Sequence, residues 1–150
     1  MRRVFYYKLY HEDMRIPELI KKDSIEIDYN LYNNRKNICS LCKDLLQIHE
    51  ECDVEYILIP IDLSFNPLGV FILNFFNVRD MNPKEVFTDI LLTGAVAFFL
   101  VKYTPINTLK IELNDINMCE MLQSLGILFD LEFIDFIVMN ESSYLTLKGK

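Results

Sequence analysis

The residues best suited to metal chemistry lie within one stretch of fourteen or so positions. Cys39, Cys42, His49 and Cys52 follow the pattern C-x2-C-x6-H-x2-C. Thiolate and imidazole are the ligands that zinc prefers in proteins, so the spacing alone would allow a zinc site. The remaining cysteine, Cys119, lies far away in the sequence.

The same stretch, however, has the periodicity of a helix. Apolar side chains recur at positions 38, 41, 45, 48 and 52, as on one face of an amphipathic helix. Along that helix Cys39 and His49 would lie about 15 Å apart, too far for two ligands of one zinc ion with bonds of about 2 Å. A redox Cys-x-x-Cys normally opens a helix after a strand, whereas this one lies inside a helix. We therefore expect free, buried thiols that pack as small hydrophobic side chains, which fits a reducing compartment.

The composition predicts one compact domain over residues 1–150. The chain has 150 residues, of which 51% are hydrophobic, and only 4 are Gly and 5 Pro. A chain of this length buries roughly 70% of the surface that it exposes when unfolded. It contains no repeat, no low-complexity tract and no Gly- or Ser-rich linker.

The charge argues against binding to nucleic acid. The formal net charge is −7, from 22 acidic and 15 basic residues, and phosphate contacts need basic residues. The basic clusters are no larger than pairs such as Arg2-Arg3 and Lys21-Lys22, which are too small to form a nucleic-acid-binding surface. We read the charges as solvated surface and expect no nucleic-acid partner.

The longest apolar segment, Ile90 to Val101, is too short to cross a membrane. It has twelve residues and is flanked by Asp89 and Lys102, whereas a spanning helix needs about 20. The N-terminal stretch is too polar for a secretory signal. We expect a buried core helix and a cytoplasmic protein.

Hydrophobic patterning predicts a mixed α/β sheet with covering helices, in the order ββαββα(β)αββ. The first half comprises a hairpin of two strands, then a helix, then two strands, at 4–10, 24–30, 34–51, 54–63 and 70–77. In the second half, Asn82, Pro83 and Glu85 have the types and spacing of a helix start. The elements expected there are a helix from 83 to about 102, a short strand at 108–113, a helix that Asn114 or Asp115 caps and Gly126 ends, and a hairpin of 131–139 with 143–148.

The order of these elements and the residues at their boundaries resemble the RadC-like branch of the JAB/MPN (JAMM) metalloprotease-fold family over about residues 36–148. The family signature His-Pro-Arg-Glu-Val-Phe is similar to Asn82–Phe87, "NPKEVF". The other matching features are Ile61-Asp62 at the end of a strand, "SLGILF", "FIDFIVM" and "SYLTLK". The resemblance implies one cytidine-deaminase-like domain, with residues 34–150 as its JAB/MPN-like core and residues 1–33 as an N-terminal β extension.

The resemblance also implies where a metal site would lie. Active members carry His-x-His-Pro, followed by Ser and Asp, and a Glu acts as general base on the zinc-bound water. With Pro105 in the position of the family's Pro, the two His fall on Lys102 and Thr104, and the Ser falls on Glu112. Only the Asp is kept, as Asp115, and Glu55 lies within one residue of the general base. These five residues would be vestigial, with neither catalytic nor metal-binding roles.

Two interpretations of the replacements remain open. In the first, the positive charge of Lys102 offsets the negative charge of Asp115, and with it that of Glu112, so that an ion pair takes the place of the metal. In the second, these residues are solvated charges on a relaxed loop. The resemblance implies a catalytically inactive protein-binding module without a cofactor, with an unidentified protein partner. One specific form is an anti-defence protein of a phage or mobile element that occludes a host enzyme. A homodimer through exposed strand edges is a further expectation.

The alternative is an enzyme. It would be a divergent metal-dependent hydrolase that holds Mg²⁺ or Mn²⁺ with the carboxylates of Glu55, Glu112 and Asp115, because hard cations accept all-oxygen ligands. The ammonium of Lys102 in the same cluster argues against it.

Overall fold

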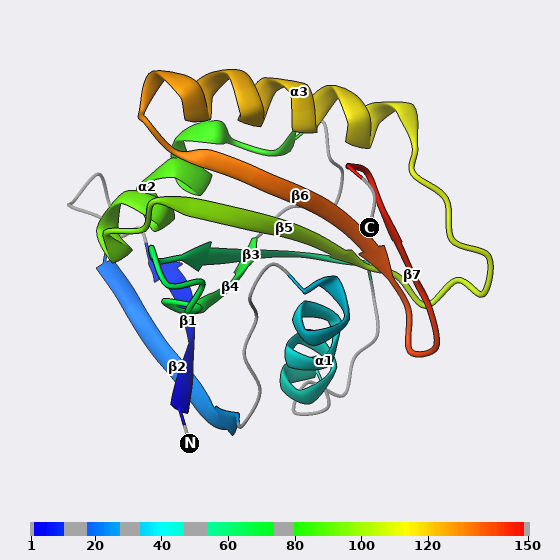
Figure 1. Cartoon of the computed structure of the whole chain (residues 1–150), viewed down its shortest axis with the longest axis horizontal. Helices are drawn as coiled ribbons and strands as arrows, with labels where there is room; N and C mark the ends of the chain where they lie inside the picture. The colour runs from blue at the N-terminus through cyan, green and yellow to red at the C-terminus, as the bar shows by residue number, and fades with distance from the viewer. Residues whose placement is uncertain (1, 11–17, 28–33, 47–53, 74–79, 149–150) are drawn as a thin grey trace.

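The computed structural model describes residues 2–10, 18–27, 34–46, 54–73 and 80–148 (Figure 1). Its elements follow the order ββαββαβαββ. They are β1 (Arg2–Tyr10), β2 (Glu18–Ile27), α1 (Arg35–Leu46), β3 (Glu55–Ile61), β4 (Val70–Leu73), α2 (Pro83–Thr93), β5 (Ala97–Tyr103), α3 (Leu113–Leu128), β6 (Glu132–Met139) and β7 (Tyr144–Thr146).

All seven strands form one mixed sheet with the order β2-β1-β4-β3-β5-β6-β7. The pairs β1–β4 and β5–β6 are parallel, and the other neighbours are antiparallel. The predicted α/β class with a mixed sheet and covering helices is therefore confirmed. The predicted N-terminal hairpin is confirmed as well, and it continues the sheet that the later strands build.

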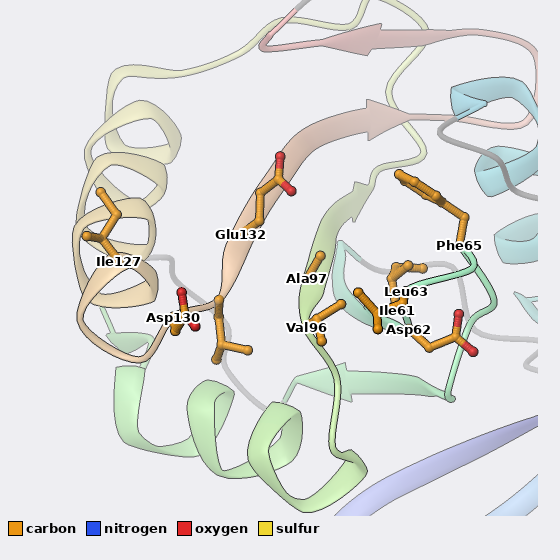
Figure 2. A pocket seen from close by; sticks show the side chains of 10 residues that line it. Ile61, Asp62, Leu63, Phe65, Val96, Ala97, Ile127, Asp130 and Glu132 are labelled. Carbon is orange, nitrogen blue, oxygen red and sulfur yellow. The ribbon is translucent and has the colours of Figure 1, made fainter.

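The segment from Ile90 to Val101 is not a core helix, and the prediction of one helix from 83 to about 102 is wrong. Helix α2 ends at Thr93 because Gly94 adopts the left-handed conformation (φ 74°) and its N–H donates to the carbonyl of Leu91 at 3.2 Å. Glycine is favoured at such a position because it has no Cβ to clash. The β-branched and aromatic residues that follow favour a strand, and β5 begins at Ala97 (Figure 2).

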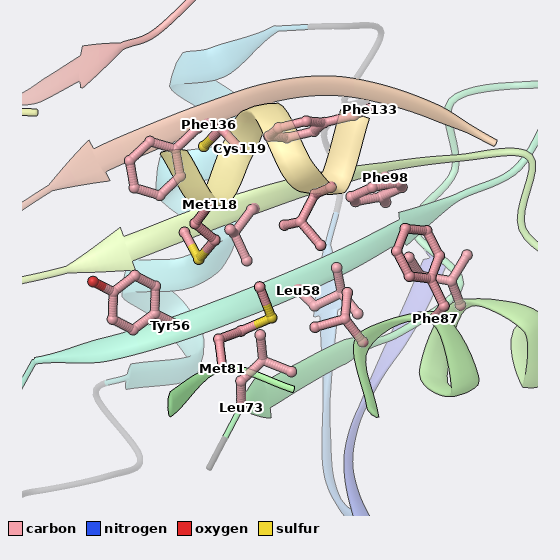
Figure 3. Packing of buried hydrophobic residues seen from close by; sticks show 14 of the residues in the cluster. Tyr56, Leu58, Leu73, Met81, Phe87, Phe98, Met118, Cys119, Phe133 and Phe136 are labelled. Carbon is pink, nitrogen blue, oxygen red and sulfur yellow. The ribbon is translucent and has the colours of Figure 1, made fainter. Parts of the chain in front are cut away.

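The strands alternate their side chains between two buried layers. Ile57 and Ile59 of β3 pack with Ile38 and Leu41 of α1 on one face of the sheet. On the other face, residues of β3 and β5 pack against α2 and α3 in a second cluster, which includes Tyr56, Leu58, Phe98, Met118 and Phe133 (Figure 3). Strand β5 is central and has six buried residues out of seven, which explains its unbroken apolar run.

The region around α3 differs from its prediction at both ends. No strand forms at 108–113, because residues 104–112 lie in a loop. Neither Asn114 nor Asp115 is the N-cap. Glu112 holds that position without a side-chain hydrogen bond, and Asp115 is in the first turn. Gly126 does not end the helix, which runs to Leu128.

Gly126 is explained by close packing instead. A Cβ added there would lie 2.7 Å from the backbone oxygen of Leu131, closer than side-chain and backbone atoms approach without a shift. The N–H of Leu131 also donates to the Gly126 carbonyl at 2.8 Å. The glycine therefore lets the chain turn tightly from α3 into β6.

The start predicted for the second strand is wrong, since β2 begins at Glu18 and not at position 24. The other boundaries agree with the predictions to within about two residues where they can be compared. Asn82 caps α2, since its side chain accepts from the N–H of Lys84 at 3.1 Å, and Pro83 is the first helical residue. Asn34 caps α1 in the same way through the N–H of Lys36 at 3.0 Å. The C-terminal hairpin is confirmed as β6 and β7. The ends predicted for the helix at 34–51 and the strand at 70–77 extend into 47–53 and 74–79, outside the described residues.

Among the described residues, no helix combines the length and the apolar character that crossing a membrane requires.

Candidate functional site

Three elements bring Tyr56, Lys102 and Asp115 together, and we call these residues the Asp115 cluster. Tyr56 is the second residue of β3, Lys102 is next to last in β5, and Asp115 lies in the first turn of α3. Tyr56 and Lys102 are direct partners in the antiparallel β3–β5 ladder. Their side chains therefore leave the same face of the sheet, the face that α3 covers.

Asp115 is the acceptor at the centre of the cluster. Its Oδ1 accepts from the Tyr56 hydroxyl at 2.9 Å, and its Oδ2 accepts from Lys102 Nζ at 3.0 Å. The ammonium also lies 5.6 Å from the centre of the Tyr56 ring. The side chains of Asp115 and Lys102 are only 1% and 12% exposed, so this ion pair is shielded from water. It agrees with the interpretation in which Lys102 offsets Asp115, and not with solvated charges on a relaxed loop.

Asp115 accepts from two side-chain donors at the start of a helix. A carboxylate in the first turn of a helix is stabilised by the positive end of the helix dipole. Burial raises the pKa of the Tyr56 hydroxyl well above its usual value, and the nearby Asp115 carboxylate adds to the rise. Tyr56 therefore stays protonated and donates to Asp115.

The other positions that were predicted to be vestigial do not join this cluster. Glu55 precedes Tyr56 in β3, so its side chain leaves the opposite face of the sheet, the side of α1. Thr104 is buried, with its N–H donating to the Met139 carbonyl at 2.9 Å and its hydroxyl accepting from the N–H of Ile106 at 3.4 Å.

Glu112 is a surface residue. Its side chain is 50% exposed, and its nearest ionic partner is Lys110, with Nζ 4.0 Å from Oε1. An exposed pair at this distance contributes little to stability. The structure thus brings together two of the five positions that were predicted to be vestigial, Lys102 and Asp115.

The residues present do not fit a zinc ion of the family type. The ammonium of Lys102 is 3.0 Å from the carboxylate of Asp115 and would repel a cation there. In the described part of the chain, no three or more His, Cys, Asp or Glu side chains form a group that could hold a metal. Glu55, Glu112 and Asp115 therefore do not converge as the alternative of a carboxylate-bound metal requires.

The thiols behave as buried hydrophobic groups. Cys39, Cys42 and Cys119 are free and buried. Burial raises the pKa of Cys39 to about 11 and that of Cys119 to about 12, so neither is a reactive thiolate at neutral pH. Cys52 and His49, as well as His11, lie outside the described residues.

A second buried ion pair, on the opposite face of the sheet, was missed at the level of sequence. Arg35 Nε of α1 donates to Oδ2 of Asp135 in β6 at 3.0 Å, with side chains 9% and 0% exposed. Oδ1 of Asp135 accepts from the N–H groups of Phe136 at 2.8 Å and Lys148 at 2.9 Å. The only signal in the sequence was a charged residue inside an otherwise apolar strand, "FIDFIVM". Tyr56 was not predicted either, because a tyrosine inside the apolar run "VEYILIPIDL" has the pattern of an ordinary core residue.

These features define a class of protein before any comparison is made. A central mixed sheet, with α1 on one face and α2 and α3 on the other, places a polar cluster at the end of β5 beside the start of α3. The family model described as RadC-like JAB domain matches residues 75–150. The chain therefore belongs to the RadC-like JAB domain family, whose fold is related to that of metal-dependent hydrolases. No match was found among curated proteins.

A third buried carboxyl, Asp89 in α2, leads to a prediction about pH. Asp89 is 1% exposed, and its Oδ1 has no hydrogen-bond partner in the described part of the chain. Burial raises its pKa from 3.8 to about 7, and the charge of Glu85 contributes. Between these two pKa values the folded protein keeps a proton on Asp89 that the unfolded chain releases. The contribution of Asp89 to stability is fully present below about pH 4 and is lost as the pH rises to about 7.

We expect Asp89→Asn, which removes this titration, to be more stable than the wild type at pH 8. The gain is at most a few kcal/mol, from about 1.4 kcal/mol per unit of pKa shift, and it disappears near pH 4. Urea denaturation at a series of pH values measures both. Asp130→Asn, at an exposed position, is the control. A difference between Asp89→Asn and wild type that does not change with pH would contradict the raised pKa.

Proposed function

We propose that this protein is a catalytically inactive RadC-like JAB domain that acts by binding another protein. One observation carries the proposal: Lys102 Nζ lies 3.0 Å from Asp115 Oδ2. In active members the corresponding carboxylate binds zinc. Here a lysine side chain of the same chain satisfies its charge, so a metal would have to displace a buried ion pair.

The chemistry of the replaced residues supports the same proposal. Thr104 has no imidazole, and its hydroxyl is engaged with a backbone N–H at 3.4 Å. Glu112 carries a negative charge where a donor to an oxyanion would be needed. Glu55 lies on the other face of the sheet, so its carboxylate is not placed to accept a proton from a water beside Asp115. A domain with this fold and without this chemistry can still offer its surface to a partner.

Metal analysis tests the inactive half of the proposal. We expect the purified wild-type protein to hold no stoichiometric zinc, manganese or magnesium after incubation with each ion and dialysis, as measured by elemental analysis. We expect the variant Lys102→His/Thr104→His, which keeps Asp115, to retain about one zinc per chain, because two imidazoles and a carboxylate are a sufficient set of protein ligands.

The control for this experiment is Lys102→His/Thr104→His/Asp115→Ala, which lacks the carboxylate and should lose the zinc. Stoichiometric metal in the wild type that Asp115→Ala removes would overturn the proposal. A well-folded double variant that takes up no zinc would contradict the correspondence of positions 102 and 104 to the family's imidazoles.

Affinity purification tests the binding half. The narrower form of the proposal is an anti-defence protein of a phage or mobile element that occludes a host enzyme. It is supported by the net charge of −7, which suits a partner with a basic surface. The tagged protein is expected to retain one enzyme from host extract and to inhibit it when both are purified. Retention without inhibition would reject the narrower form and keep the binding module.

A further inference from the structure

The structure contains an apolar pocket at the end of the sheet opposite the Asp115 cluster, and we call it the sheet-end pocket. Its volume is about 530 Å³. It lies where β3 ends, β5 and β6 begin and α3 ends (Figure 2). Its lining residues are Ile61, Asp62, Leu63, Phe65, Val96, Ala97, Ile127, Asp130, Leu131 and Glu132.

The pocket is separate from the Asp115 cluster. The β ladders place Ala97 beside Ile61 on one side and beside Glu132 on the other. Lys102 is five residues further along β5, about 16 Å away at the rise of an extended strand. Substitutions at the pocket therefore leave the Asp115 cluster untouched.

The apolar residues at the mouth of the pocket are unusually exposed. Leu63 is 85% exposed, Ile127 is 72% exposed and Val96 is 37% exposed. A contiguous group of large apolar side chains open to solvent commonly marks a contact surface. The buried residues Ile61, Ala97 and Leu131 form its floor, so an inserted apolar group would meet a mostly apolar surface there.

The charges at the pocket have one sign. Asp62, Asp130 and Glu132 are its only charged lining residues, and none of them takes part in an ion pair within the described part of the chain. Asp62 is held by its own turn, where its Oδ1 accepts from the N–H groups of Ser64 and Asn66 at 2.8 and 2.9 Å. The carboxylates of Asp130 and Glu132 are exposed and available to a cationic partner.

We propose that the sheet-end pocket binds an apolar side chain of a partner protein whose neighbouring residues are Lys or Arg. The apolar floor takes the side chain, and the carboxylates of Asp130 and Glu132 pair with the flanking cations. Charge complementarity of this kind selects the partner and speeds the encounter. A second copy of this acidic chain would set like charges against each other, so a basic partner fits better. The inference rests on the proposed binding function and names its surface.

The test begins with a library of random twelve-residue peptides displayed on phage and selected on the immobilised full-length protein. We expect the selected peptides to combine a large apolar residue with adjacent Lys or Arg. The best peptide is then synthesised with a fluorophore, and its anisotropy gives the Kd. The Kd should rise as NaCl is increased from about 0.05 M to about 0.5 M, because exposed ion pairs are screened by salt.

Matched variants locate the binding. Glu132→Lys reverses a charge at the pocket and Ile127→Ser removes an exposed apolar side chain. Each should raise the Kd about tenfold. Glu120→Lys and Leu113→Ser make the same two kinds of change on α3 outside the pocket, at an exposed acid and at a leucine that is 71% exposed. They should leave the Kd unchanged. Thermal unfolding confirms that all four variants fold.

Three outcomes would overturn this inference. The first is a set of selected peptides without basic residues, and the second is equal Kd values for the pocket variants and the control variants. The third is a wild-type dimer in sedimentation velocity that Glu132→Lys dissociates, which would mean that a second copy covers the pocket. If Glu132→Lys still retains the partner from host extract, this inference fails while the proposed function stands. If the wild type holds a catalytic metal, the proposed function fails. The peptide Kd values of the pocket and control variants then still test this inference.

Discussion

Lys102→Met is expected to lower the free energy of unfolding by about 3–5 kcal/mol, the range observed when one partner of a buried ion pair is removed. The remaining carboxylate of Asp115 is fully buried and, among the described residues, would keep only the Tyr56 hydroxyl as a side-chain donor. Its negative charge would then lack a counter-charge in a region of low dielectric. Urea denaturation followed by circular dichroism at pH 7 measures the loss.

The control is Lys110→Met, in the exposed pair of Lys110 with Glu112, whose side chains are 77% and 50% exposed. It should change stability by less than about 0.5 kcal/mol. The double variant Lys102→Met/Asp115→Leu should recover most of the loss, because replacing both charges with apolar groups removes the burial penalty together with the attraction. If Lys102→Met were no more destabilising than Lys110→Met, the ion pair would not act as a structural clamp in place of a metal.

Asp135→Ala is expected to have an effect of similar size, about 3–5 kcal/mol, through the second buried ion pair. It would leave the guanidinium of Arg35 buried without this carboxylate and would remove the acceptor of two backbone N–H groups, of Phe136 and Lys148. Because Asp135 joins α1, β6 and the residues after β7, the loss should also be seen locally. Amide hydrogen exchange should become faster in α1 and β7.

Glu132→Ala, an exposed acid at the start of the same strand, is the control and should alter neither stability nor exchange in α1. Asp135→Asn should lose less stability than Asp135→Ala and more than Glu132→Ala. Its amide oxygen can still accept from the backbone, while the charge that pairs with Arg35 is lost. Wild-type exchange rates in α1 of Asp135→Ala would mean that the ion pair does not hold this helix on the sheet.

The sequence by itself determined the class of fold and most of its parts. The alternation in β1 and β2, the apolar run of β3 and the cap at Asn82 are local signals, and local signals survive in the folded chain. That Lys and Thr, and not His, stand at positions 102 and 104 could also be read directly from the sequence, whereas their correspondence to the family's imidazoles stays a prediction. The segment from Ile90 to Val101 was misread because a short apolar run has no period that separates a buried strand from a buried helix. Gly94 was the overlooked signal.

Only the tertiary structure decided which charges meet. Lys102 and Asp115 are thirteen residues apart, and whether they pair or point to solvent depends on the β3–β5 register and on how α3 packs over that face. Tyr56 and Glu55 are adjacent in β3, so their side chains point to opposite faces of the sheet. The side chain of Tyr56 therefore reaches Asp115, and that of Glu55 does not. Arg35 and Asp135 are separated by 100 positions, beyond any local pattern. The sheet-end pocket likewise exists only because β3, β5, β6 and α3 end or begin side by side.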